Sequence, residues 1–201
     1  KRLRGILVLA SCDLLKGSED DAIPLAVAVE MVHASSLILD DLPSMDDATL
    51  RRGRPTLHKA MGESTAILAA VALLNAGFAS VLQASALKDR SRVAAARRLQ
   101  EAIGADGLIG GQLVDLTSTG AKLDLEALEY IHSHKTGALF IAAVELGAIA
   151  ASGSAREIEA LRRYAKNLGL AFQITDDLLD YSGNPETTGK DAGLDRDRTT
   201  F

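Results

Sequence analysis

Residues 63–86 read ESTAILAAVALLNAGFASVLQASA. Most of these residues are apolar, many are alanine or leucine, and no proline interrupts them. The stretch therefore predicts a long helix rather than a strand. Its apolar residues surround the helix instead of forming one stripe, which is typical of a helix at the centre of a large bundle. We expect other helices to cover it on several sides.

The remainder of the chain has the same helix-forming composition. Its 201 residues include 33 alanines and 31 leucines, whereas valine and isoleucine are too few for a core dominated by sheet. We predict an all-α, single-domain helical bundle over residues 1–201. The chain opens at Lys1 and closes at Phe201 without an evident start or stop, so we expect the domain to be incomplete at both ends. Besides 63–86, helices are predicted over residues 2–16, 20–41, 91–117, 125–151 and 155–181, with loops over 46–54 and 182–201.

The formal net charge is −5 and the isoelectric point is near 5.4. An acidic balance argues against a nucleic-acid partner, because the surface that binds nucleic acid is basic. Aromatic residues are also too few to form stacking platforms for bases. Cys12 is the single cysteine, which excludes a disulfide framework and a cysteine-based zinc site. It fits a reducing compartment, so a cytoplasmic location is expected, with a plastid left open.

Two stretches are apolar enough to raise the question of a membrane span. Residues 66–87 are interrupted by polar residues such as Asn75 and Gln83, and residues 137–152 contain Glu145. A spanning helix needs about 20 consecutive apolar residues. We therefore expect core helices and no membrane span.

Carboxylates gather at two places in the sequence. One group closes the second predicted helix and the other lies in the last helix, where the residues at i and i+4 share a face. In the first group, Pro43 must fold the chain back if the aspartates on its two sides are to meet. Carboxylates beside apolar residues repel each other unless a cation joins them. Oxygen ligands suit a hard cation such as Mg²⁺, which often bridges carboxylates to substrate phosphates. The groups are Asp40, Asp41, Asp46 and Asp47, and Asp176, Asp177 and Asp180.

Basic residues accompany these aspartates. Arg51 and Arg52 follow the first group directly, and Lys135 interrupts an otherwise apolar helix. Guanidinium groups match the geometry of a diphosphate. Together, the acidic groups and the surrounding cations fit two phosphorylated ligands, one held through metal and one held directly. Further cations stand at Lys1, Arg4, Arg54 and Lys190.

These motifs resemble those of the trans-prenyl diphosphate synthases, in the family's order and over essentially the whole chain. The segment DDLPSMDD at 40–47, followed by RRGRPT at 51–56, is similar to the family's first aspartate-rich motif. Four residues separate Asp41 from Asp46, as in the bacterial and plastid geranylgeranyl or short-chain branch. The later motifs match in Gly110-Gly111-Gln112 with Asp115, in Lys135-Thr136-Gly137 and in FQITDDLLD at 172–180.

The resemblance implies an all-α bundle around a deep central cavity, usually in a homodimer, with three Mg²⁺ ions per active site. It implies condensation of an allylic diphosphate (dimethylallyl, geranyl or farnesyl) with isopentenyl diphosphate. The implied metal ligands are Asp40, Asp41, Asp46, Asp176, Asp177 and Asp180. The allylic diphosphate would contact Arg51, Lys135 and Lys190, and isopentenyl diphosphate would contact Lys1, Arg4, His33 and Arg52. The implied catalytic residues, beside the allylic carbon, are Lys135, Thr136 and Gln173.

Product length is expected to depend on the space below the first aspartate motif. Ser36 lies one helical turn, about 6 Å, from Asp40, and Ser35 is its neighbour. Family members that stop early carry an aromatic residue there. Two serines therefore predict a C20 product, geranylgeranyl diphosphate, ahead of the C15 product, farnesyl diphosphate.

Three other functions compete with this interpretation. Glu30-x-x-His33 and Glu129-x-x-His132 are spaced as in di-iron carboxylate bundles, but that function leaves the aspartates without a role. A catalytically silent family member, acting as a regulatory or binding subunit, would lack an aspartate from one group, and both groups are complete. A class I terpene cyclase would usually replace the second group with an Asn/Ser/Glu pattern, which is not found. Leu194 and Arg198 do depart from the family, which usually has lysines there.

Overall fold

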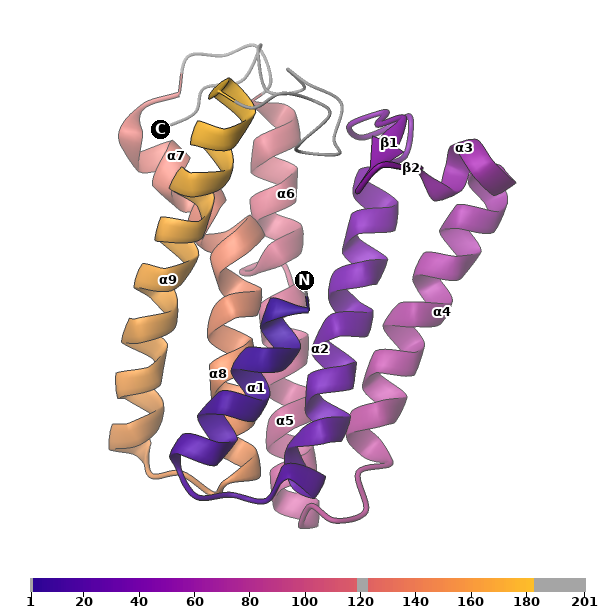
Figure 1. The fold of residues 1–201 in the computed structure, drawn as a ribbon. Helices are drawn as coiled ribbons and strands as arrows, with labels where there is room; N and C mark the ends of the chain where they lie inside the picture. Colours follow the sequence, from indigo (N-terminus) through magenta and orange to yellow (C-terminus); the bar gives the residue numbers. More distant parts are fainter. Residues whose placement is uncertain (1, 119–122, 183–201) are drawn as a thin grey trace.

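The computed structural model describes residues 2–118 and 123–182, and the all-α prediction is confirmed. Helices form a bundle, with a short hairpin of two two-residue strands at one end (Figure 1). The helices are α1 Leu3–Leu14, α2 Glu19–Asp40, α3 Leu57–Met61, α4 Glu63–Leu82, α5 Asp89–Ile103, α6 Leu108–Thr117, α7 Leu125–Ile131, the π-helix η1 His132–Gly137, α8 Ala138–Ala150 and α9 Ala155–Ser182. The hairpin strands are β1 Leu50–Arg51 and β2 Arg54–Pro55.

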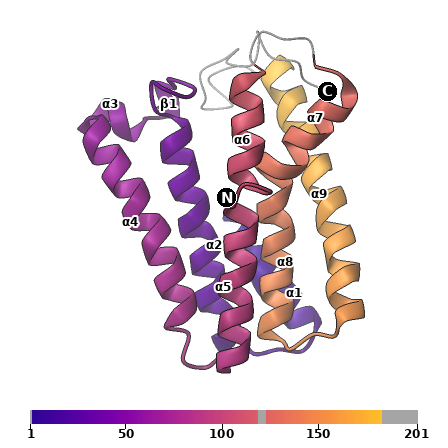
Figure 2. The ribbon, with the colours of Figure 1, turned by 180° about the vertical axis from the view of Figure 1, so that it is seen from behind.

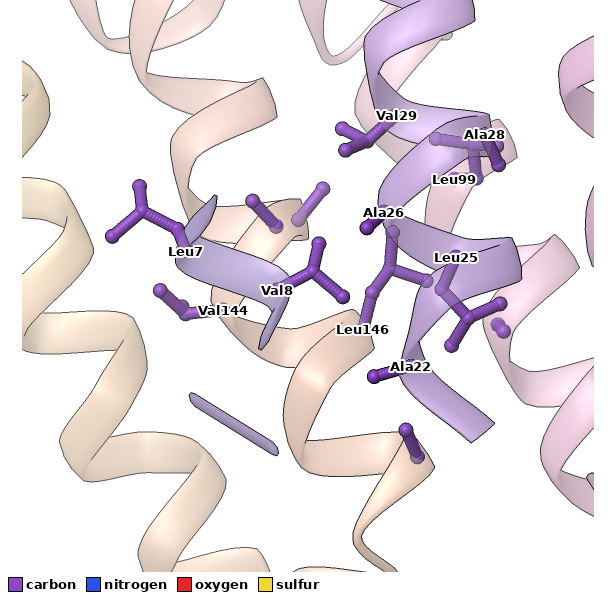
Figure 3. Close-up of a cluster of buried hydrophobic side chains, with 14 of the residues drawn as sticks. Leu7, Val8, Ala22, Leu25, Ala26, Ala28, Val29, Leu99, Val144 and Leu146 are labelled. Carbon is purple, nitrogen blue, oxygen red and sulfur yellow. The ribbon is translucent and has the colours of Figure 1, made fainter. Parts of the chain in front are cut away.

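Helix α8 lies at the centre of the core. It packs against α1, α2, α5 and α9, and its side chains are buried almost all round. Its small alanines let the neighbouring helices approach closely, while Phe140 and Leu146 fill the space between them. Figure 3 shows Leu7 and Val8 of α1 meeting Val144 and Leu146 of α8 beside the apolar side chains of α2.

Helix α4 departs from its expected place at the bundle's centre. It packs on α2, α3 and α5 but lies at the edge of the bundle (Figure 2). Its side chains Ile67, Leu68 and Val71 are largely exposed. Both α2 and α4 are long and apolar enough to cross a membrane, a criterion that core helices of soluble proteins also meet.

Three other local differences from the predicted elements have clear causes. The helix predicted over residues 91–117 is two helices, because the chain leaves helical geometry at Gly104 and Gly107. The helix predicted over 125–151 contains the π-helical turn η1, a form of helix that often marks functional sites. The predicted loop 46–54 contains part of the hairpin, whose turn residues Arg52 and Gly53 both have positive φ, as two-residue hairpin turns require.

The polar ends of α2, α6 and α9 lie together. All three run toward the same end of the bundle, where the hairpin and α7 also lie (Figures 1 and 2). The two aspartate groups stand near the C-terminal ends of α2 and α9. The fold thus brings them to one end of the bundle. The deep central cavity implied by the family resemblance stays a prediction.

A buried ion cluster holds the opposite half of the bundle together. The side chain of Glu145 in α8 is 3% exposed. Its carboxylate accepts hydrogen bonds from Arg98 of α5 and from Arg162 of α9, whose Nε lies 2.7 Å away. One carboxylate therefore ties α8 to two neighbouring helices.

Glu145→Ala should lower the free energy of unfolding by about 3–5 kcal/mol, because it leaves Arg98 mostly buried without its carboxylate. Urea unfolding followed by circular dichroism measures the change. Glu101→Ala is the matched control, because it breaks only the exposed pair with Arg97 and should cost less than about 1 kcal/mol. Equal losses in the two variants would contradict a structural role for the cluster.

Candidate active site

The first aspartate group folds back on itself, which is the condition for the aspartates on the two sides of Pro43 to meet. Asp40 is the last residue of α2, and the Asp46 amide donates a hydrogen bond to the Asp40 carbonyl oxygen at 3.0 Å. The Asp47 amide reaches the Leu42 carbonyl oxygen at 3.1 Å. These bonds close the loop after Pro43 and return Asp46 to the end of α2.

Arg51 neutralises Asp41. The Arg51 Nε donates to both carboxylate oxygens, at 2.8 and 2.9 Å, and Nη2 lies 2.6 Å from Oδ1. Asp41 is nearly fully buried. Burial alone would lower the pKa of Arg51, but the hydrogen bond and the charges of Asp41, Asp40 and Asp46 raise it above its ordinary value. The β1 strand thus delivers a permanent cation to the aspartates.

Lys135 lies between two further carboxylates. Its Nζ is 2.6 Å from Asp115 Oδ2 and 3.9 Å from Asp40 Oδ1. Burial opposes the charge, but Asp40 and Asp115 together raise the pKa of Lys135 above its ordinary value. Burial also raises the pKa of Asp40, a shift that Lys135 and Arg51 partly offset. Lys135 is therefore a charged lysine held by α2 and α6.

Two residues of this cluster had no role assigned from sequence. Gln112 donates a hydrogen bond from Nε2 to Asp40, and Asp115 pairs with Lys135. Both were recognised only as parts of a family motif. Their i,i+3 spacing on α6 was the signal that they share a face. That face meets the end of α2 and η1.

Close contact between α6 and η1 sets the position of Lys135. A Cβ atom on Gly111 would lie 2.3 Å from the Lys135 backbone nitrogen and 2.9 Å from the His134 Cβ. Only glycine permits this approach. Gly111 of α6 therefore serves the close packing of α6 on η1.

A hydrogen-bonded chain links η1 to the second aspartate group. Thr136 Oγ1 donates to Gln173 Oε1 at 2.9 Å, and Gln173 Nε2 donates to Asp177 Oδ1 at 2.7 Å. Gln173 and Asp177 are one turn apart on α9. The predicted catalytic residues Lys135, Thr136 and Gln173 are thus connected to both aspartate groups.

The second aspartate group is only partly described. Asp177 is buried and faces η1, whereas the side chain of Asp180 lies outside the described residues. Its apolar neighbours Ile174, Leu178 and Leu179 are exposed, because α9 packs against η1 and α8 on one side. Within residues 2–118 and 123–182, no three acidic, histidine or cysteine side chains converge closely enough to hold a metal ion.

Two of the predicted isopentenyl diphosphate residues, Arg4 of α1 and His33 of α2, meet between these helices. Arg4 is buried and its Nη1 donates to His33 Nε2 at 3.1 Å, while its guanidinium lies 4.7 Å from the Phe140 ring centre. Burial, with a smaller effect of Arg52, lowers the pKa of Arg4 to about 10, against the charge of Glu30. Burial and the charges of Arg4, Arg52 and Arg51 lower the pKa of His33 to about 3. His33 is therefore neutral and accepts at Nε2.

The other predicted site residues lie on α2 and in the hairpin, or outside the described residues. Arg52 is exposed in the hairpin turn. Ser35 is buried and donates to the Ala70 carbonyl oxygen of α4 at 2.8 Å, and Ser36 donates to the His33 carbonyl oxygen at 2.9 Å. Lys1 and Lys190 lie outside the described residues, as do Leu194 and Arg198.

The two Glu-x-x-His segments do not form a shared site among the described residues. Glu129 is exposed on α7. Glu30 accepts a hydrogen bond from the Gly5 amide at 2.8 Å, and His33 pairs with Arg4. These contacts give no support to a di-iron centre.

Comparison with known proteins identifies relatives over the whole chain. Residues 1–201 match a family model described as polyprenyl synthetase. Geranylgeranyl pyrophosphate synthase 7, chloroplastic, from Arabidopsis thaliana is 48% identical over 100% of this chain and 59% of its own length. The heterodimeric geranylgeranyl pyrophosphate synthase large subunit 2 from the same plant is 49% identical over 98% of this chain and 53% of its own. The chain thus spans little more than half of these relatives.

A solved structure is also similar. Geranyltransferase from Helicobacter pylori, complexed with magnesium and isoprenyl diphosphate, matches with a TM-score of 0.94 and 35% identity. The match covers 100% of this chain and 68% of that one.

Gly111→Ala should lower the free energy of unfolding by about 1–3 kcal/mol, because the added Cβ meets backbone that cannot yield without moving η1. Urea unfolding measures the loss. Gly104→Ala is the control, since its Cβ would lie no nearer than 3.3 Å to any neighbour. A loss in Gly111→Ala no larger than in the control would contradict the close approach.

Stability should fall as pH is lowered from about 6.5, because the unfolded chain protonates its His33 while the folded chain, with a pKa of about 3, does not. Between these values His33 contributes a slope of up to about 1.4 kcal/mol per pH unit. Urea unfolding from pH 7 to pH 5 measures it. His33→Gln should show a shallower slope, and equal slopes would contradict the neutral, buried histidine.

Proposed function

The chain belongs to the polyprenyl synthetase family, and we propose that it is a magnesium-dependent prenyltransferase. It joins an allylic diphosphate to isopentenyl diphosphate and gives a short-chain trans-prenyl diphosphate. The observation that carries this proposal is the set of contacts that η1 makes at one end of the bundle. Lys135 pairs with Asp115 and lies 3.9 Å from Asp40, while its neighbour Thr136 is linked through Gln173 to Asp177. The names of the similar plant and bacterial enzymes support it.

The carboxylates suit Mg²⁺, because the donor set consists of oxygen atoms alone. We assign Asp40, Asp41 and Asp46 to one side of the metal site and Asp176, Asp177 and Asp180 to the other, with three ions as in the family. When bound, the metal supplies positive charge that stabilises the departing diphosphate. The magnesium in the Helicobacter pylori relative supports this assignment.

The chain's own cations hold the allylic diphosphate. Arg51 and Lys135 keep their positive charge despite burial, since aspartates surround them. Charge that develops on the leaving diphosphate is stabilised by groups already fixed in place. Lys190 is assigned the same role.

Thr136 and Gln173 face the carbocation that forms when the diphosphate leaves. Because the Gln173 amide nitrogen donates to Asp177, its oxygen remains the acceptor for Thr136. Oriented oxygen dipoles stabilise positive charge without acting as a base. No side chain in this network is an evident base for the final proton loss, which we assign to the departing diphosphate.

Isopentenyl diphosphate binds to Arg4, Arg52 and His33, together with Lys1. The Nε2 atom of neutral His33 accepts from Arg4, so its Nδ1 carries the proton and can donate. Three donors on α1, α2 and the hairpin then converge on one anion. Arg4 also lies over Phe140, which fixes its guanidinium plane.

A C20 product, geranylgeranyl diphosphate, is the first choice, with C15 second. Ser35 packs against α4 and Ser36 is small, so neither residue puts an aromatic ring in the path of a product that grows along α2 below Asp40. The names of the plant relatives support the C20 product.

The partner is a second copy of this chain. The exposed apolar residues Ile67, Leu68 and Val71 on α4 form a surface that a homodimer would cover. A relative described as the large subunit of a heterodimer makes a related subunit the alternative.

The chloroplastic relative favours a plastid-type enzyme over the cytoplasmic location expected from the sequence. We assign residues 1–201 to one prenyl synthase domain.

A product assay tests the activity. The chain is incubated with Mg²⁺, labelled isopentenyl diphosphate and C5, C10 or C15 allylic primers, and the extracted prenyl alcohols are sized. We expect a C20 product that disappears with EDTA, because removal of the metal leaves the leaving diphosphate without its main counter-charge. Ser36→Phe should shorten the product.

Each other outcome has a defined meaning. A C15 product would overturn the proposed C20 product length but support the proposed condensation reaction. No condensation with any primer, in a chain that still binds diphosphates, would favour the silent subunit.

A further inference from the structure

Glu30 of α2 binds a backbone amide at the start of α1. Its carboxylate oxygen accepts a hydrogen bond from the Gly5 amide at 2.8 Å. Gly5 lies in the first turn of α1, where backbone amides have no partner within the helix. Arg2, the residue that precedes α1, makes no capping bond with its side chain. A carboxylate from α2 therefore fulfils this role.

The same turn of α1 carries Arg4. Glu30 and His33 are i,i+3 neighbours on α2, so they lie on one face. One receives the Gly5 amide at 2.8 Å and the other receives Arg4 Nη1 at 3.1 Å. Two consecutive residues of α1 are thus fixed by two side chains one turn apart on α2.

The first turn of α1 packs closely on α2 at Gly5, so that a side chain larger than hydrogen would crowd Glu30. A Cβ atom on Gly5 would lie 3.1 Å from Glu30 Cγ and 3.4 Å from the Ala26 carbonyl oxygen. The carboxylate also favours the buried Arg4 cation, which burial disfavours. Glu30 therefore lies against both the backbone and the charge of the α1 first turn.

We propose that Glu30 is a positioning residue that holds Arg4 in place for isopentenyl diphosphate by anchoring the first turn of α1. The proposal rests on the proposed function, because it assigns Glu30 to the site of that substrate. In this role Glu30 acts through Arg4 and not on the reacting atoms. Its loss should weaken the binding of one substrate and leave the other unaffected.

The test compares Glu30→Ala and Glu30→Gln with wild type in steady-state kinetics. In Glu30→Ala, we expect the KM for isopentenyl diphosphate to rise about tenfold, since a charge-assisted hydrogen bond is lost. The KM for the allylic diphosphate and kcat should stay within about twofold. Glu30→Gln keeps an acceptor for the Gly5 amide, so it should recover part of the affinity. Calorimetric titration with isopentenyl diphosphate gives a second, turnover-independent readout.

Glu157→Ala is the matched control. Glu157 accepts from the Ser154 amide at 2.7 Å, so its carboxylate binds a backbone amide at the start of α9 as Glu30 does at α1. It should lower stability slightly and change neither KM. A merely structural role for Glu30 would give the same pattern in Glu30→Ala.

The remaining outcomes separate the two proposals. An unchanged KM for isopentenyl diphosphate in an active Glu30→Ala or Glu30→Gln variant overturns the role of Glu30 alone. Equal changes in both KM values and kcat also overturn it. Wild-type chain that neither turns over nor binds isopentenyl diphosphate overturns the proposed function and, with it, this inference.

Discussion

Repulsion between carboxylates at helix C-terminal ends is the constraint on which this structure depends. The C-terminal end of a helix already carries a partial negative charge. Asp40 and Asp41 stand at the end of α2, and Asp177 stands near the end of α9. Such an arrangement is unfavourable unless cations lie within a few ångströms. Arg51 pairs with Asp41, and Lys135 lies between Asp115 and Asp40, so both cations stabilise the end of α2 as well as forming part of the candidate site. Asp177 accepts a hydrogen bond from Gln173.

The two cations reach their places through unusual backbone rather than through long side chains alone. Arg51 precedes a hairpin turn in which Arg52 and Gly53 both have positive φ. Lys135 is carried by a π-helical turn whose backbone lies against Gly111. A π-turn inserts a residue and rotates the helix on its C-terminal side, so α8 keeps its buried face while Lys135 faces the aspartates. The positive φ angles of the hairpin turn and the close packing of η1 on Gly111 therefore both place a cation beside the aspartates.

Helix content could be predicted from sequence because composition reports on it directly, and spacing alone located the two aspartate groups, whereas the roles of the site residues came from the family resemblance and stay predictions. The return of Asp46 to Asp40 was recognised as a condition for the two residues to meet, and the helix ends at 40 and 182 are close to the predicted ones. The division of residues 91–117, the π-turn and the edge position of α4 could not be predicted. Each depends on which helix packs where, and periodicity does not record that. Asp115 was visible in a motif, but its role needed the position of Lys135.

Glu30 and His33 illustrate the same limit at one pair of residues. Their spacing establishes that both side chains leave α2 on one face, and this holds equally for a metal centre and for a helix contact. Whether the two residues bind a metal or contact a helix depends on the element that packs against that face. Here it is the first turn of α1, which presents an amide donor at Gly5 and a guanidinium at Arg4. Two donors facing a carboxylate and a neutral imidazole satisfy one another without a metal ion. The spacing of Glu30 and His33 therefore serves a contact between α2 and α1.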